Sequence, residues 1–100
     1  MTGLPTLGMA VEVSDNVLFQ DLHGEGVLLN VQTGVYLGLD AIGTRAWQLL
    51  GKSAVLSELL TKILAEYDVP ESRCSEDLLA LVADLERHGL VTLSHPRGTR

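Results

Sequence analysis

The sequence predicts a single α+β domain of winged helix-turn-helix type, with an N-terminal three-stranded antiparallel sheet followed by three helices. Apolar and polar residues alternate in short runs over the first forty residues, glycine-containing turns separate these runs, and the apolar spacing becomes helical after Asp40. With 100 residues, 46% of them hydrophobic, the chain suits one modest core. We expect loose tails over residues 1–8, which contain Gly, Pro and Thr, and 94–100, which contain Pro, Gly and two arginines, around a folded domain over 9–93.

The first strands are expected over residues 9–13 and 17–19, because apolar side chains alternate there on both sides of a Ser14-Asp15-Asn16 turn. Gly24 and Gly26 then predict a second turn, since glycine adopts positive φ at little cost.

A tight hairpin follows. The apolar run 27–31 and the run 35–39 are separated by Gln32-Thr33-Gly34, a three-residue connection that ends in glycine. Glycine best tolerates the left-handed conformation at this position of such loops. We therefore expect these two runs to pair antiparallel.

Helical spacing begins at Asp40, which can cap the first helix, and Gly51 ends that helix. The second helix has Ser53 as a possible cap and should end near Asp68, because the residue before Pro70 avoids helical angles.

The third helix is expected to start between residues 70 and 75 and to end at Gly89. Its apolar stripe includes Cys74, which we interpret as a core residue because free cysteines are usually buried. Residues 90–93 are β-prone and form either a last strand or an extended tail packed on the core.

No motif in the sequence predicts catalysis. His23, His88, His95 and the single cysteine are scattered at spacings that do not suit zinc ligands. A glycine-rich phosphate loop, a serine elbow and a carboxylate pair in apolar context are all missing from the sequence. We therefore expect no enzymatic activity, no catalytic residue, no metal and no cofactor.

The charge balance disfavours nucleic acid and anionic membranes as partners. Thirteen acidic and seven basic side chains give a net charge of −6. Residues 71–89, which would supply a DNA-reading helix, contain five acids and two bases, so DNA readout is disfavoured. The sequence also lacks a run of 18 apolar residues and a secretory signal, which predicts a cytoplasmic protein.

An edge strand can instead bind an extended peptide through its main chain, while neighbouring pockets supply specificity. The second hairpin strand suits this role. If Leu39 faces the core, Val35 and Leu37 share its face, while Tyr36 and Gly38 point outward. On the helix side, the resulting groove would be lined by Leu78, Leu81 and Val82.

Landmarks along the chain resemble the pyrroloquinoline quinone biosynthesis protein D (PqqD) family. The resemblance covers roughly residues 9–93 and rests on an ordered set of short segments. These are the run from Val27 to Asp40, then Gly43, Trp47 and Leu50, then Glu66-Tyr67-Asp68-Val69, Asp77-Leu78-Leu79 and Gly89-Leu90-Val91.

The resemblance implies that the chain is a recognition element for the leader segment of a ribosomally synthesised, post-translationally modified peptide (RiPP). In that family the leader adds as a strand beside the hairpin and lies against the third helix. With its hydrophobic, aromatic hairpin strand, the chain looks most similar to the stand-alone B1 proteins of lasso peptide biosynthesis, which deliver the precursor to a leader protease. The implied peptide-binding residues are Val35, Tyr36, Leu37, Gly38, Leu39, Asp77, Leu78, Leu81 and Val82.

Three alternatives stay open at this point. The chain could be a PqqD proper, which delivers its precursor to a radical SAM enzyme, or a winged-helix DNA-binding regulator. It could also be an oligomerisation module, because an open edge strand can pair with its own copy to form a homodimer.

Overall fold

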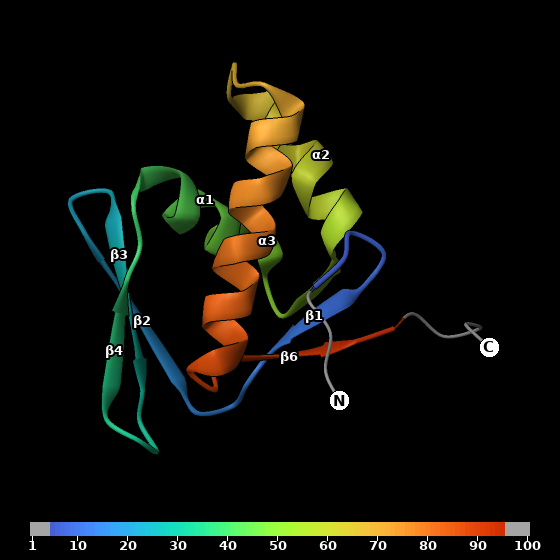
Figure 1. Ribbon diagram of the computed structural model, residues 1–100. Coiled ribbons are helices and arrows are strands. Elements are labelled where there is room, and N and C mark those ends of the chain that lie inside the picture. The colour runs from blue at the N-terminus through green and yellow to red at the C-terminus, as the bar shows by residue number, and fades with distance from the viewer. Residues whose placement is uncertain (1–4, 96–100) are drawn as a thin grey trace.

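The computed structural model describes residues 5–95, which form six strands and three helices (Figure 1). The expected tails, 1–8 and 94–100, lie partly outside this range. Within it, Leu7 packs against the core and its carbonyl accepts a hydrogen bond from the Ser57 amide at 2.9 Å. Ser94 is the last residue of a strand.

The predicted three-stranded antiparallel sheet is present as β2 (Val17–Leu22), β3 (Glu25–Asn30) and β4 (Val35–Gly38), in the order β2-β3-β4. Gly34 has φ +77°, as the hairpin prediction requires. Among the described residues β4 pairs only with β3, so it is an edge strand of this sheet.

The turn between β2 and β3 differs from the prediction. His23 and Gly24 make it with φ of 61° and 89°, whereas Gly26 lies inside β3. A Cβ on Gly26 would collide with the ring of Phe19, so this glycine serves close packing between strands. Its amide donates a buried 2.6 Å hydrogen bond to the Thr44 hydroxyl, which joins β3 to the first helix.

The structure also has a second three-stranded sheet, which the sequence did not predict. It has the order β5-β1-β6, with β1 (Ala10–Val13) in the centre, β5 (Ser53–Val55) and β6 (Val91–Ser94). Ser53 was expected to cap a helix, but it pairs with Glu12 instead. Both edges of β1 thus gain hydrogen-bonded partners from segments more than 35 residues away, and local propensity does not determine such pairings.

The three predicted helices are confirmed as α1 (Ala41–Leu50), α2 (Leu56–Glu66) and α3 (Glu71–Arg87). The Asp40 carboxylate caps α1 by accepting from the Gly43 amide at 2.7 Å. Gly51 follows α1 with positive φ, as expected. No side chain caps α2.

The hydrophobic core lies where the helices meet both sheets (Figure 1). The α+β class is therefore confirmed, while the winged helix-turn-helix arrangement remains a prediction. Within residues 5–95, no helix is long and apolar enough to cross a membrane. The fully buried large side chains are Val11, Leu28, Leu56, Ile63, Val82, Leu90 and Val91.

Asn30 connects the β2-β3-β4 sheet to the end of α3. It is 3% exposed, and its Nδ2 donates to the His88 carbonyl at 2.9 Å. Its Oδ1 accepts from Asn16 Nδ2 at 2.8 Å and from the amides of Gln32 and Thr33 at 2.9 and 3.2 Å. One side chain thus fixes the base of the hairpin that carries β4.

Candidate functional site

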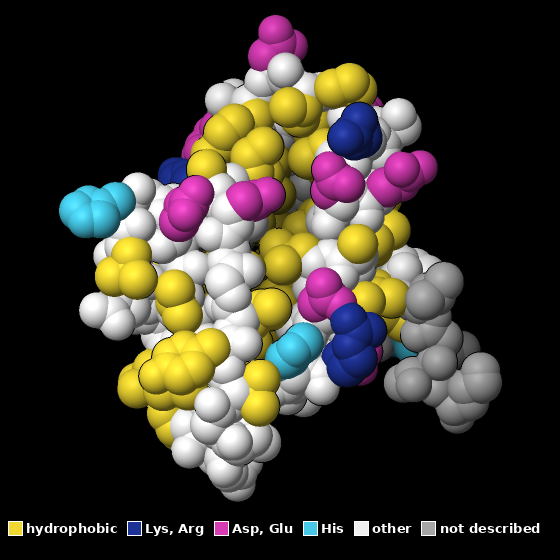
Figure 2. All heavy atoms as spheres, turned by 60° about the vertical axis from the view of Figure 1, so that its left-hand side comes forward, with side chains coloured by type: hydrophobic (Ala, Val, Ile, Leu, Met, Phe, Trp, Pro, Cys, Tyr) yellow, Lys and Arg dark blue, Asp and Glu magenta, His cyan; other side chains and the backbone are white. Residues whose placement is uncertain are grey.

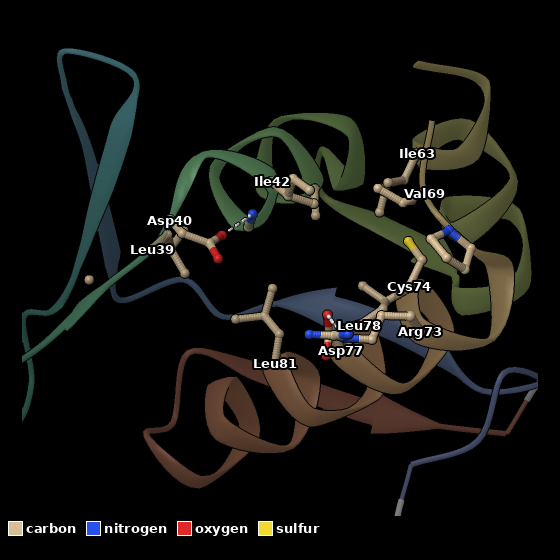
Figure 3. Close-up of a pocket in the computed structure, with 14 residues that line it drawn as sticks. Leu39, Asp40, Ile42, Ile63, Val69, Arg73, Cys74, Asp77, Leu78 and Leu81 are labelled. Carbon is tan, nitrogen blue, oxygen red and sulfur yellow. Dashed lines mark hydrogen bonds and ion pairs between the residues drawn. The ribbon is translucent and has the colours of Figure 1, made fainter. Parts of the chain in front are cut away.

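A cavity of about 480 Å³ opens between the end of β4, α1 and the N-terminal half of α3. Figure 3 shows Leu39, Ile42 and Leu81 projecting into it from the β4–α1 connection, α1 and α3. We call this cavity the groove. Its lining consists of Gly38, Leu39, Asp40, Ile42, Gly43, Ala46, Ile63, Val69, Pro70, Arg73, Cys74, Asp77, Leu78 and Leu81.

The free edge of β4 lies next to this groove. Continuing the β3–β4 register places Leu39 opposite Gly26, and the two form a bonded pair through the Leu39 amide alone, which donates to the Gly26 carbonyl at 2.8 Å while the Gly26 amide donates to Thr44. Because such pairs alternate along an antiparallel ladder, the N–H and C=O groups of Tyr36 and Gly38 point away from β3. These four polar groups are available to an additional strand.

Apolar residues on one face of α3 form a wall of the groove. Cys74, Leu78 and Leu81 follow one another at i, i+4 and i+7, so they lie on one face of the helix. Cys74 and Leu78 are buried at 7% and 4% exposure, while Leu81 is half-buried and faces the opening. The wall can therefore accept apolar side chains of a ligand without rearranging the core.

An ion pair holds α1 against the end of α2. Arg45 donates to both carboxylate oxygens of Glu66, with Nε to Oε1 at 2.7 Å and Nη2 to Oε2 at 2.8 Å. The hydrogen bond from Arg45 lowers the pKa of the Glu66 carboxyl. Glu66 is the last residue of α2 and precedes Val69 by three positions. The bidentate ion pair therefore anchors the chain just before Val69, which lines the groove.

Charged residues stand at the groove mouth. Asp40 and Asp77 are exposed there, and Arg73 Nε lies 3.8 Å from Asp77 Oδ2. In Figure 2, hydrophobic side chains form the floor of the hollow and charged ones surround it. Because the Arg73–Asp77 pair is well exposed, it contributes little to stability, and both side chains can pair with a ligand.

The cysteine of the groove is poorly suited to nucleophilic catalysis. Burial raises the pKa of the Cys74 thiol, and the Asp77 charge raises it further, which disfavours the nucleophilic thiolate. No group of three or more His, Cys, Asp or Glu residues is arranged to hold a metal ion in this part of the chain. The groove is suited to binding.

The structure brings together five of the nine residues expected to bind peptide. Gly38, Leu39, Asp77, Leu78 and Leu81 line the groove. The other four lie around it. Val35, Tyr36 and Leu37 continue along β4 beyond the groove, and Val82 is in the core at 2% exposure.

Sequence reasoning missed the end of the groove formed by Ile42, Val69 and Pro70 and the charged side chain of Arg73. Arg73 stands four residues before Asp77, and that spacing would have placed it on the same helix face. Ile42 lies on α1 and Val69 in the connection between α2 and α3, and how closely they approach the α3 wall depends on the tertiary packing.

The comparison with protein families and the comparison with solved structures both found matches. The family model described as coenzyme PQQ synthesis protein D (PqqD) matches residues 25–91. A solved structure of TbiB1 in complex with the TbiA(beta) leader peptide is 39% identical, with a TM-score of 0.71, and the match covers 80% of this chain and 93% of that chain.

A second similar structure, a lasso peptide synthetase B1 complexed with the leader peptide, is 20% identical with a TM-score of 0.65. That match covers 82% of this chain and 96% of the other, and it supports the fold alone. No curated protein matches the chain.

Proposed function

Since the chain belongs to the PqqD family, we propose that it is a non-catalytic RiPP recognition element that binds the leader segment of a precursor peptide. The leader adds as a strand to the free edge of β4, and its side chains enter the groove. The observation that carries this proposal is the free backbone edge at Tyr36 and Gly38 beside an apolar groove. A 39% identical protein has been solved with a leader peptide bound.

Strand addition suits this geometry. The main-chain groups of Tyr36 and Gly38 supply affinity that depends little on the leader sequence, and the groove supplies specificity for alternate side chains. We assign the strand contacts to residues 35–39 and the helix contacts to Asp77, Leu78 and Leu81. Val82 supports the wall from inside the core.

We further propose that the bound precursor is presented to a separate processing enzyme, a lasso peptide leader protease, in the cytoplasm where precursors are synthesised. Pairing of two β4 edges into a homodimer would use the same backbone groups as the leader. The leader and a second copy of the chain would then compete for the same edge.

Fluorescence anisotropy of a labelled leader peptide, taken from the precursor encoded beside this chain, tests the proposal. We expect saturable binding, with a scrambled leader of the same composition as the control. Equal affinity for the scrambled peptide, or no binding to any neighbouring precursor, would refute a leader-binding function.

The single cysteine of the chain reports whether the ligand fills the groove. Cys74 lines the groove and its thiol pKa is raised by burial, so alkylation by iodoacetamide should already be slow. We expect saturating leader to slow it at least about fivefold, measured by mass spectrometry. If alkylation required global unfolding, its rate without leader would rise in low urea with the unfolded population, so a rate that does not depend on low urea assigns the protection to direct cover by the peptide. An unchanged alkylation rate with the leader bound would show that the leader does not occupy the groove.

A further inference from the structure

The sheet that carries the proposed binding edge also has an exposed apolar face. Leu18 on β2 is opposite Leu29 on β3, and Leu29 is opposite Tyr36 on β4, so these three side chains form one row across the sheet. Leu18 and Tyr36 are 59% and 66% exposed, and Leu22, two positions further along the same face of β2 from Gln20, is 49% exposed. We call this surface, made by Leu18, Leu22, Leu29 and Tyr36, the outer face.

The inner face of the same sheet is already packed. Phe19 stacks on Trp47 of α1 with ring centroids 6.4 Å apart, and Leu28 is completely buried. Because side chains alternate between faces, the positions next to Phe19 and Leu28 must point away from the core. In Figure 1 the helices lie on one side of this sheet, and Figure 2 shows hydrophobic side chains gathered at its lower left. The exposure of the outer face therefore follows from the fold.

A solvent-facing side of an antiparallel sheet normally carries polar residues. A contiguous row of large apolar side chains on such a face typically marks a protein interaction site. Gln20 is the polar residue between Leu18 and Leu22 on β2, and it does not separate the row that crosses the sheet. This face therefore has the character of a surface that a partner protein covers.

Charge indicates what kind of partner fits. The first 44 residues contain no Lys or Arg, so every formal charge on the β2-β3-β4 sheet and its turns is negative. Asp21 and Glu25 lie at one end of the outer face and Asp15 precedes β2 at the other. A second copy of this chain would bring acids against acids, with a net charge of −6 on each molecule. A protein with an apolar patch surrounded by Lys and Arg is complementary.

We propose that the outer face docks the enzyme that processes the bound precursor, through an apolar patch with a basic rim on that enzyme. This inference rests on the proposed function. A leader strand added to the edge of β4 extends the same sheet, so an enzyme on the outer face lies against both the recognition element and the leader. The edge and the groove remain free for the peptide, because the docking surface is the opposite face of the sheet.

Leu18→Glu tests the proposal, because Leu18 is exposed on β2, the strand farthest from the β4 edge, and the change adds a negative charge to the row. Thr61→Glu is the matched control, since it adds the same charge at an exposed position of α2. The probes are the labelled leader peptide and the purified leader protease encoded with this chain. Leu22→Glu repeats the test at a second position.

We expect Leu18→Glu to keep the leader dissociation constant within about twofold and to weaken protease binding, measured by biolayer interferometry without leader, at least about tenfold. Cleavage of the precursor at limiting protease should fall by a similar factor, while Thr61→Glu behaves like wild type. Loss of protease binding in Leu18→Glu supports the outer face as the docking site, whether or not the leader binds. If the leader does not bind the wild-type protein, only the proposed function fails.

Unchanged protease binding in both Leu18→Glu and Leu22→Glu would overturn the proposal. So would a wild-type dimer in sedimentation experiments that either substitution dissociates, because the occupant would then be a second copy of the chain. Thermal unfolding of each variant checks that the sheet is intact.

Discussion

Replacing Leu81 with Asp should abolish measurable leader binding while the domain still folds. Leu81 is half-buried on the groove wall of α3, and its side chain projects into the space that the leader would fill (Figure 3). Loss of an apolar contact of this size costs about 1.5–3 kcal/mol. Burying an unpaired carboxylate under the peptide costs several kcal/mol more, in order-of-magnitude terms. We therefore expect the dissociation constant to rise at least about 100-fold.

Ser72→Asp is the matched control for this prediction. Ser72 is exposed on α3 nine residues before Leu81, which is half a turn around the helix from it, so the substitution adds the same charge to α3 away from the groove. We expect wild-type anisotropy for this variant. Leu81→Ala should raise the dissociation constant about tenfold, since it removes the contact without adding a charge. A folded Leu81→Asp protein with wild-type affinity, as judged by circular dichroism and anisotropy together, would move the peptide out of the groove.

The largest effect on stability is expected at Asn30. Asn30→Ala removes the donor to the His88 carbonyl and the acceptor for the Gln32 and Thr33 amides, in a side chain that is 3% exposed. Asn30 itself is buried but its partners are only part-buried, so each unsatisfied partner costs at most about 1–3 kcal/mol. We expect the free energy of unfolding, measured by urea denaturation, to fall by about 3 kcal/mol.

Gln32→Ala is the control, because it changes a side chain of the same turn without removing the hydrogen bonds of the Asn30 side chain. The Gln32 side chain accepts only an exposed hydrogen bond from Asn16, at 3.3 Å, so its loss should change the free energy of unfolding by less than about 0.5 kcal/mol. If Asn30→Ala is no more destabilising than Gln32→Ala, the connection between the hairpin and α3 is not important for stability. Leader affinity should fall with Asn30→Ala as well, because the same side chain holds the base of the β4 hairpin.

The local elements of the fold could be predicted because their signals lie within a few residues. Asp40 caps α1 through an amide three positions away, and Gly34 needs only its own positive φ. The apolar spacing of Cys74, Leu78 and Leu81 likewise depends on the period of one helix. The class, the three helices and the hairpin were therefore accessible from the sequence.

For the same reason, the candidate site could be predicted only in part from the sequence. The alternation along β4 and the stripe along α3 identified the two walls, since each lies on a single element. Whether a residue of that stripe faces the groove or the core depends on the angle at which α3 packs. Leu81 faces the groove and Val82 the core at 2% exposure, although both are apolar neighbours in the sequence.

By itself, the sequence determined the resemblance to the PqqD family, the acidic charge, the hairpin and the helical stripes, because these depend on residue type and short spacing. The tertiary structure decided the strand at residues 53–55, the strand position of Gly26 and the exposure of the outer face. Ser53 could cap a helix locally, but the hydrogen bonds offered by β1 outweigh that preference once the chain is compact. Pairings across tens of residues are set by which edges and faces remain unfilled, and only the folded chain contains that information.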